Sequence, residues 1–130
     1  MTIVVGFVPT KEGRAAFDRA VAESTLRNTS LVVINSNRGG RDYHARDAES
    51  EAELERLAAD VRATGVDIEV RQLVRGNEPA EDLMAVAEEV DADLIVIGLR
   101  RRSPVGKLIL GSNAQRILLD APCPVLAVKA

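Results

Sequence analysis

The chain has 130 residues, of which 46% are hydrophobic, 28% are charged and 2% are aromatic, and its net charge is −3. This length predicts a single domain over residues 1–130 with room for a buried core. The negative charge and the scarcity of aromatic side chains argue against a nucleic-acid-binding protein. No apolar stretch reaches the roughly 20 residues of a membrane span, and the first residues lack the basic and apolar regions of a signal peptide.

Cys123 is the only cysteine in the sequence, so no internal disulfide can form. No second cysteine and no histidine cluster lies near it to build a metal site. We interpret Cys123 as a small buried side chain rather than a reactive thiol. This cysteine usage is typical of a cytoplasmic protein, which is the location we expect.

Five segments have strand patterns. Three short apolar runs are typical of parallel strands buried on both faces, namely residues 3–8, 31–34 and 94–97. Residues 66–74 alternate between apolar and charged side chains, which favours an edge strand. A fifth run extends from Val125 to Val128 near the end of the chain.

Helical spacing of apolar residues, three and four apart, separates these runs. The first helix is marked by Phe17, Ala20 and Val21; the second by Leu54, Leu57, Ala58 and Val61; the third by Leu83, Val86, Ala87 and Val90; the fourth by Ala114, Ile117, Leu118 and Ala121. Gly65 is expected to end the second helix, and Pro79 lies in the first turn of the third. Strands that alternate with helices predict an α/β fold, a doubly wound, open, five-stranded parallel sheet with helices on both faces.

The segment from Ile97 to Ser112 carries the chemistry. It holds four basic residues and no acid, in a chain that is acidic overall. Ser112 opens the fourth helix and Gln115 follows three residues later, which is the pattern of a capping box. The backbone N–H groups of Gly111 and Ser112 at a positive helix end would also suit a phosphate.

The chain resembles the universal stress protein family over essentially its whole length. The resemblance is strongest in residues 92–98, Gly111-Ser112 and residues 123–128. The family's nucleotide motif is glycine, two residues, glycine, nine residues, glycine, then serine or threonine. Here it reads Gly98, two residues, Arg101, nine residues, Gly111 and Ser112, so the spacing is kept and the middle glycine is not.

The resemblance implies a sheet of order 3-2-1-4-5 and a small stress-response regulatory module that binds ATP or a related adenine nucleotide, with Mg²⁺ as a companion of the nucleotide. Ligands bind where such a sheet reverses its strand order. The implied nucleotide-binding residues are Pro9, Thr10, Ile34, Gly98, Arg100, Arg101, Gly111, Ser112 and Asn113. It implies no catalytic residue, and any ATPase activity should be weak, because no group that could activate water is visible near the motif. The resemblance and the apolar edge strand 125–128 both predict a homodimer.

Two departures from the family pattern fall in the predicted crevice. Arg101 replaces the middle glycine and could either obstruct the phosphates or pair with them. ATP-binding members look like Val-Asp-Gly-Ser or Pro-Thr-Asp after the first strand, whereas this chain has Val8-Pro9-Thr10-Lys11 and no aspartate. The position at which we expect a restored carboxylate to tighten nucleotide binding is Val8.

Two alternatives stay open at this point. One is a dimeric interaction domain that binds no nucleotide, which the two departures favour. The other is an enzyme on a related nucleotide-binding α/β fold, although its Ser-Gly-Gly-x-Asp-Ser or His-x-Gly-His signatures are absent from the sequence.

Overall fold

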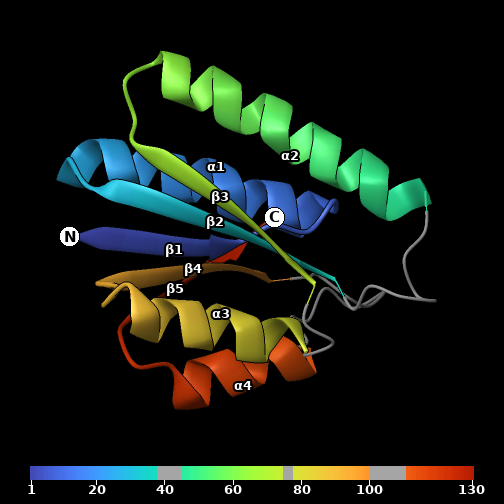
Figure 1. The fold of residues 1–130 in the computed structure, drawn as a ribbon. Helices are drawn as coiled ribbons and strands as arrows, with labels where there is room; N and C mark the ends of the chain where they lie inside the picture. The colour runs from blue at the N-terminus through green and yellow to red at the C-terminus, as the bar shows by residue number, and fades with distance from the viewer. Residues whose placement is uncertain (38–44, 75–77, 100–110) are drawn as a thin grey trace.

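The computed structural model describes residues 1–37, 45–74, 78–99 and 111–130 (Figure 1). Five strands alternate with four helices in these ranges. In chain order they are β1 (Thr2–Gly6), α1 (Lys11–Arg27), β2 (Ser30–Asn37), α2 (Ala45–Ala63), β3 (Ile68–Val74), α3 (Pro79–Glu89), β4 (Leu94–Leu99), α4 (Ser112–Asp120) and β5 (Val125–Lys129). Within the described ranges, no helix has the length and apolar character needed to cross a membrane.

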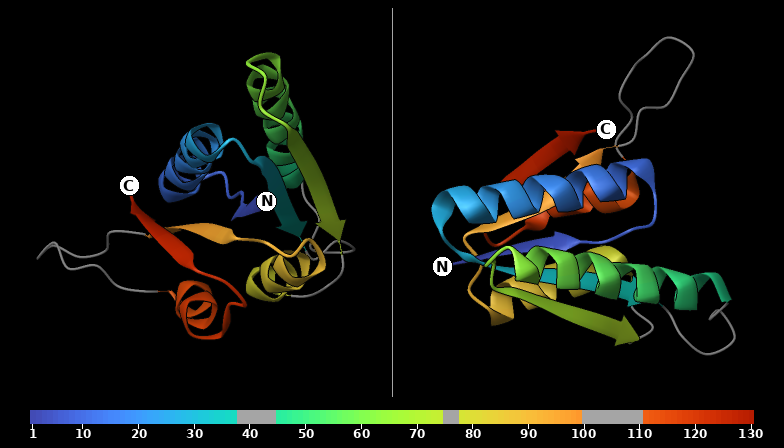
Figure 2. Two further views of the ribbon diagram at one scale, coloured as in Figure 1. Left: turned by 90° about the vertical axis from the view of Figure 1, so that its left-hand side faces the viewer. Right: turned by 90° about the horizontal axis from the view of Figure 1, so that it is seen from above.

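The strands form one parallel sheet of order β3-β2-β1-β4-β5, which confirms the predicted fold class and strand order. β1 lies at the centre, where Val4 pairs with Val32 of β2 and with Ile95 of β4. The alternating segment 66–74 forms the edge strand β3, as its pattern predicted. Figures 1 and 2 show α1 and α2 on one face of the sheet and α3 and α4 on the other.

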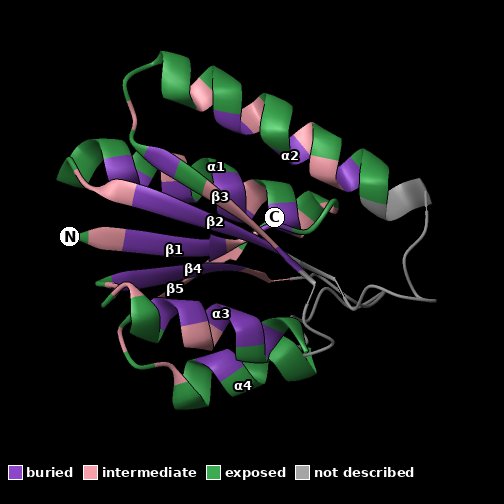
Figure 3. Cartoon of the chain, viewed as in Figure 1, coloured by how far each residue is buried: buried purple, intermediate pink, exposed green. Residues whose placement is uncertain are grey.

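Each face of the sheet has its own apolar core. On the α1 and α2 face, Phe17 and Leu54 pack against alternate residues of the strands. On the α3 and α4 face, Val86 and Ile117 pack against the residues in between. Figure 3 shows the resulting band of buried strands between mostly exposed outer helix surfaces. Buried branched side chains on both faces explain why the central strands appear in the sequence as continuous apolar runs.

Two predicted helix ends are confirmed. Gly65 follows α2 with a φ of 99°, a left-handed conformation that glycine adopts at low cost. Pro79 is the first residue of α3, where its missing N–H has no helical partner to lose.

Two predictions about α4 are wrong. Gly111, not Ser112, is the N-cap residue, and no side chain in the described ranges caps this helix end, so the Ser112–Gln115 capping box does not form. Gln115 instead donates its backbone N–H to the Gly111 carbonyl over 3.0 Å, as an ordinary first helical bond. Leu118 was expected to face the core but is 41% exposed, whereas Ile117 is 4% exposed. The core therefore buries a narrower stripe of α4 than the apolar spacing predicted.

Candidate functional site

The carboxyl ends of all five strands lie along one edge of the sheet, because the strands are parallel. α1 leaves β1 on one face, while β4 is followed by α4 on the opposite face. β1 and β4 are neighbours in the sheet, so the chain reverses direction between them. Open α/β sheets bind ligands in the crevice that such a reversal opens, and helix N-termini at that edge favour anions.

Pro9 and Thr10 form the turn from β1 into α1. Thr10 is the N-cap residue of α1, and its hydroxyl accepts the backbone N–H of Gly13 over 3.1 Å. The Thr10 N–H donates to the Val8 carbonyl over 2.8 Å, which closes the turn. Val8 is 49% exposed beside it. The Thr10 hydroxyl therefore has a structural role, and it keeps its own proton to donate.

Gly13 is a structural residue that the sequence interpretation missed. A Cβ atom at this position would overlap the Val8 carbonyl oxygen, with the carbonyl carbon 2.8 Å away. Only glycine allows the first turn of α1 to pack this closely against the end of β1. The available signal was a glycine inside a helical pattern, which often marks a close backbone contact.

Gly98, at the end of β4, lies directly against the first turn of α1. A Cβ atom here would overlap the Glu12 carbonyl oxygen and come within 2.7 Å of its carbon. The first glycine of the motif therefore permits close packing of β4 against α1, whether or not a ligand is bound. This contact brings Gly98 and the segment after Thr10 together at the switch point, as the resemblance implied.

Ile34 supports the end of β1 from the neighbouring strand. Its backbone carbonyl accepts the Phe7 N–H over 2.8 Å. Its side chain is 2% exposed and belongs to the core under α3 and α4. Only a backbone lone pair of Ile34 remains available to a ligand.

Gly111, Ser112 and Asn113 form the exposed start of α4. No atom of the described residues lies within 4 Å of a Cβ atom built on Gly111, and its φ of −68° suits any residue. Because no side chain of the described residues caps this end, its first N–H groups are candidates for binding an anion. An ion pair between Arg116 and Glu81 of 3.0 Å connects α4 to α3. Arg100 and Arg101 lie outside the described residues.

Several buried polar side chains were also missed. Asp82, in the first turn of α3, is 1% exposed, and its position four residues before Val86 was the signal that it faces inward. Near the carboxyl ends of β2 and β3, Asn35 and Gln72 are paired in register. The amide atoms of Gln72 and the hydroxyl of Ser50 are buried without a hydrogen-bond partner in the structure. The crevice edge of the sheet thus has polar groups inside the fold as well as on its surface.

The described residues contain no group of three histidine, cysteine, aspartate or glutamate side chains that could hold a metal ion. Cys123 is half-buried. Burial raises the pKa of its thiol, and the nearby Asp93 carboxylate adds to the effect. A neutral thiol of this kind is a poor nucleophile and supports the interpretation of Cys123 as a packing residue.

These features define a class of protein: an open, doubly wound α/β domain with a topological switch point between β1 and β4 and an exposed helix start beside it. The comparison with known proteins is more specific. The universal stress protein family model matches residues 1–129, and the chain belongs to this family.

Individual relatives agree with this assignment. A universal stress protein of Mycolicibacterium smegmatis is 46% identical over 127 residues, which cover 98% of this chain and 96% of the relative. The structure of the universal stress protein from Archaeoglobus fulgidus in complex with dAMP has a TM-score of 0.79 at 33% identity, covering 99% of this chain and 98% of that one. A universal stress protein in complex with cAMP has a TM-score of 0.74 at 30% identity, covering 99% and 96%.

Proposed function

We propose that this chain is a stress-response regulatory module that binds an adenine nucleotide, with ATP the leading candidate, in the crevice between β1 and β4. The observation that carries the proposal is the exposed start of α4, which no described side chain caps, beside a switch point where Gly98 allows β4 to pack closely against α1. Two relatives with the same fold, at 33% and 30% identity, are described in complex with dAMP and cAMP.

In this proposal the phosphates lie at the start of α4. The backbone N–H groups of Ser112 and Asn113 point out of a positive helix end and donate to phosphate oxygens. Thr10 and Pro9 border the nucleoside at the end of β1, and Ile34 offers a backbone carbonyl. Arg100 and Arg101 supply positive charge from the segment between β4 and α4. Any Mg²⁺ would be held mainly by the phosphates, since the described residues provide no cluster of metal ligands.

The proposed role is binding rather than catalysis. The crevice residues named here include no histidine, no pair of carboxylates and no metal cluster that would activate water, so hydrolysis of ATP should be slow at most. A cytoplasmic location stays a prediction from cysteine usage. The domain is proposed to act as a homodimer through β5, whose outer edge pairs with none of the described strands.

Thermal unfolding with and without ATP tests the proposal. A ligand at one hundred times its Kd stabilises the folded state by about 2.7 kcal/mol, so millimolar ATP should raise the melting temperature by several degrees. Gly111→Val should fold, because the described residues leave space for a side chain there and the backbone φ suits any residue, but should lose the ATP effect. Ser112→Ala is the matched control, since it removes a hydroxyl and keeps the backbone N–H.

The alternative, a dimeric interaction domain without a nucleotide, makes the opposite prediction. An unchanged melting curve at millimolar ATP, together with no nucleotide in the supernatant of the denatured protein, would contradict the proposal and favour that alternative. Loss of the ATP effect in Ser112→Ala but not in Gly111→Val would contradict the proposed backbone contacts while leaving nucleotide binding intact.

A further inference from the structure

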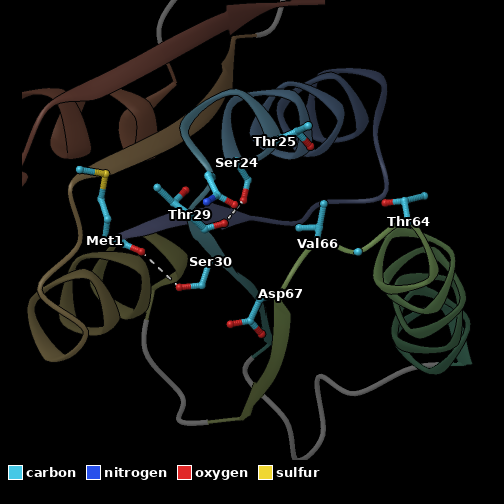
Figure 4. Close-up of a pocket in the computed structure, with 10 residues that line it drawn as sticks. Met1, Ser24, Thr25, Thr29, Ser30, Thr64, Val66 and Asp67 are labelled. Carbon is cyan, nitrogen blue, oxygen red and sulfur yellow. Dashed lines mark hydrogen bonds between the residues drawn. The ribbon is translucent and has the colours of Figure 1, made fainter.

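A cavity of about 620 Å³ lies at the amino edge of the sheet, opposite the proposed nucleotide crevice (Figure 4). Its wall is chemically mixed. The Asp67 carboxylate accepts hydrogen bonds, the Asn28 amide both donates and accepts, and the Thr29 hydroxyl is buried without a partner among the described residues. Such a wall favours no single class of ligand. The apolar surface around β5 is more specific.

Large apolar side chains are exposed on the two helices that flank β5. On α4, Leu118 is 41% and Leu119 is 75% exposed, and on α1, Leu26 is 76% exposed. α1 contacts β5 on one face of the sheet, and α4 lies on the other face (Figure 2). Among the described residues of α2 and α3, no large apolar side chain is exposed. Exposed apolar side chains gathered in one region mark an interaction surface rather than chance exposure.

Helix geometry directs Leu118 toward the free edge of β5. Ile117 is buried in the core under α3 and α4, and Arg116 pairs with Glu81 of α3 over 3.0 Å. Consecutive residues of an α-helix are turned by about 100°, so Arg116 and Leu118 lie on opposite sides of Ile117. The Arg116 side faces α3, which packs on β1 and β2. The Leu118 side therefore faces outward past β5, whereas Leu119, turned by a further step, points away from the sheet.

Ala127 of β5 lies level with this part of α4. α4 ends at Asp120, and the chain turns back into β5 at Val125. One turn back along a helix and two residues forward along a strand both cover about 6 Å. Ala127 is exposed, and its partner in register, Ile97, belongs to the core on the α4 face. Leu118 and Ala127 thus expose apolar groups on the same face beside the free edge.

The length of β5 explains why a second copy of the chain would need these side chains. β5 has five residues, and a strand of this length extends only about 17 Å. Stable interfaces between proteins bury about 1,200 Å² or more. The backbone edge of one short strand is too small to bury that area. Side chains on the flanking helices must supply the rest.

We propose that Leu118 and Ala127 form the apolar centre of a contact between two copies of this chain. The proposal rests on the homodimer through β5 proposed above and names the side chains that stabilise it. Antiparallel pairing of two β5 strands places the two-fold axis perpendicular to the sheet, so both α4 helices lie on the same face. The Leu118 side chains of the two copies then contact each other across the axis, and Leu119 stays in solvent.

Sedimentation equilibrium of the full chain without nucleotide measures the dimer dissociation constant. We expect Leu118→Ser to raise it on the order of tenfold to a hundredfold, because each dimer loses two central side chains. Leu119→Ser is the matched control, since it makes the same change at the neighbouring position, and it should leave the constant unchanged. Circular dichroism checks that both variants are folded.

Cross-linking provides a second readout that does not depend on stability. In a Cys123→Ala background, a short bismaleimide should join two copies of Leu118→Cys and should not join two copies of Leu119→Cys. The proposal is overturned if the two serine variants weaken the dimer equally, or if the cross-link forms at position 119 and not at position 118. A dimer unaffected by Leu118→Ser but dissociated by Ala127→Pro would also overturn it, while leaving pairing through β5 intact. A monomeric unmodified protein would instead contradict the homodimer itself.

Discussion

At the scale of single residues, the two glycines of the motif turn out to have different roles. Position 98 requires glycine because the backbone of Glu12 packs against it, whereas Gly111 has no described residue close to its Cβ position and a φ that suits any residue. The sequence motif marks both positions but cannot separate a packing requirement from a binding one. That difference depends on how closely α1 approaches β4, a tertiary contact between segments more than 80 residues apart. Thr10 is similar, because its capping bond is visible only once α1 is seen to begin at Lys11.

Glu23 provides a test of electrostatics at the same scale. It lies on α1 between Arg19 at 2.7 Å and Arg27 at 3.1 Å. The hydrogen bond from Arg27 is the main cause that lowers the Glu23 pKa; burial opposes it and Arg19 adds to it. A pKa lower in the folded state than in the unfolded state stabilises the fold above the unfolded value, about 4.3. This contribution disappears as the pH falls through the folded pKa.

We therefore expect the Glu23→Gln variant to have a lower free energy of unfolding than the unmodified protein at pH 7. This deficit, the difference between the two proteins, should become smaller in acid. Urea unfolding at pH 7 and at about pH 3, below the usual glutamate pKa, measures the difference. Glu55→Gln, an exposed residue of α2, should match the unmodified protein at both values. An equal deficit for Glu23→Gln at both pH values would mean that the side chain stabilises α1 by packing rather than by charge.

At the scale of elements, helix ends set by glycine or proline were predictable and side-chain caps were not. Gly65 and Pro79 act through their own backbone restrictions, so the local sequence is sufficient. The start of α4 depends on where the backbone becomes helical. Its N-cap residue is Gly111, one position earlier than the Ser112–Gln115 spacing indicated. The exposure of Leu118 likewise depends on which side of α4 packs against the sheet. The spacing of apolar residues does not give this information.

The cap of α1 gives a prediction for one element. Thr10→Ala removes the acceptor of the Gly13 N–H and should lower the free energy of unfolding by about 1 kcal/mol. Thr10→Ser keeps the hydroxyl and should retain most of that stability. Chemical denaturation of the three proteins without nucleotide provides the comparison. If Thr10→Ser loses as much as Thr10→Ala, the threonine methyl group rather than the cap stabilises this turn.

At the scale of the whole molecule, the proposed dimer depends on which backbone groups of β5 face outward. The Ile95 N–H donates to the Pro124 carbonyl over 3.0 Å, and Leu126 pairs with Val96. In a parallel ladder, this hydrogen bond and register direct the backbone N–H and carbonyl of Leu126 toward β4. The N–H and carbonyl of Ala127 then point toward the free edge of β5. A proline at position 126 would therefore break the sheet itself, whereas one at position 127 affects only the outer edge.

Ala127→Pro should convert a dimer of the 14.0 kDa chain into a folded monomer. Light scattering at micromolar concentration measures the mass, and circular dichroism checks the fold. Leu126→Pro is the contrasting variant and should unfold the protein. A monomeric unmodified protein, or an Ala127→Pro variant that remains dimeric, would contradict pairing through β5.

The architecture as a whole was available from the sequence because every element has a clear pattern. Continuous apolar runs such as residues 94–97 predicted buried parallel strands, and the alternation around Ile68 predicted the edge strand. The order of the strands came from the family resemblance rather than from periodicity. The cavity at the amino edge of the sheet could not be predicted, because its wall joins segments near the ends of α1 and α2 that are distant in sequence.

The central position of β1 also has a consequence for the kinetics of folding. β1 pairs with β2, the next strand in the chain, whereas its other edge pairs with β4, which follows much later in the sequence. The Asp93 N–H bonds to the Thr2 carbonyl over 2.8 Å, and these two residues are 91 positions apart. Contacts of such long sequence separation close slowly. During synthesis, the apolar edge of β1 that faces β4 therefore stays without its partner at least until β4 has left the ribosome, and in this interval the nascent chain is most prone to pair with a wrong strand.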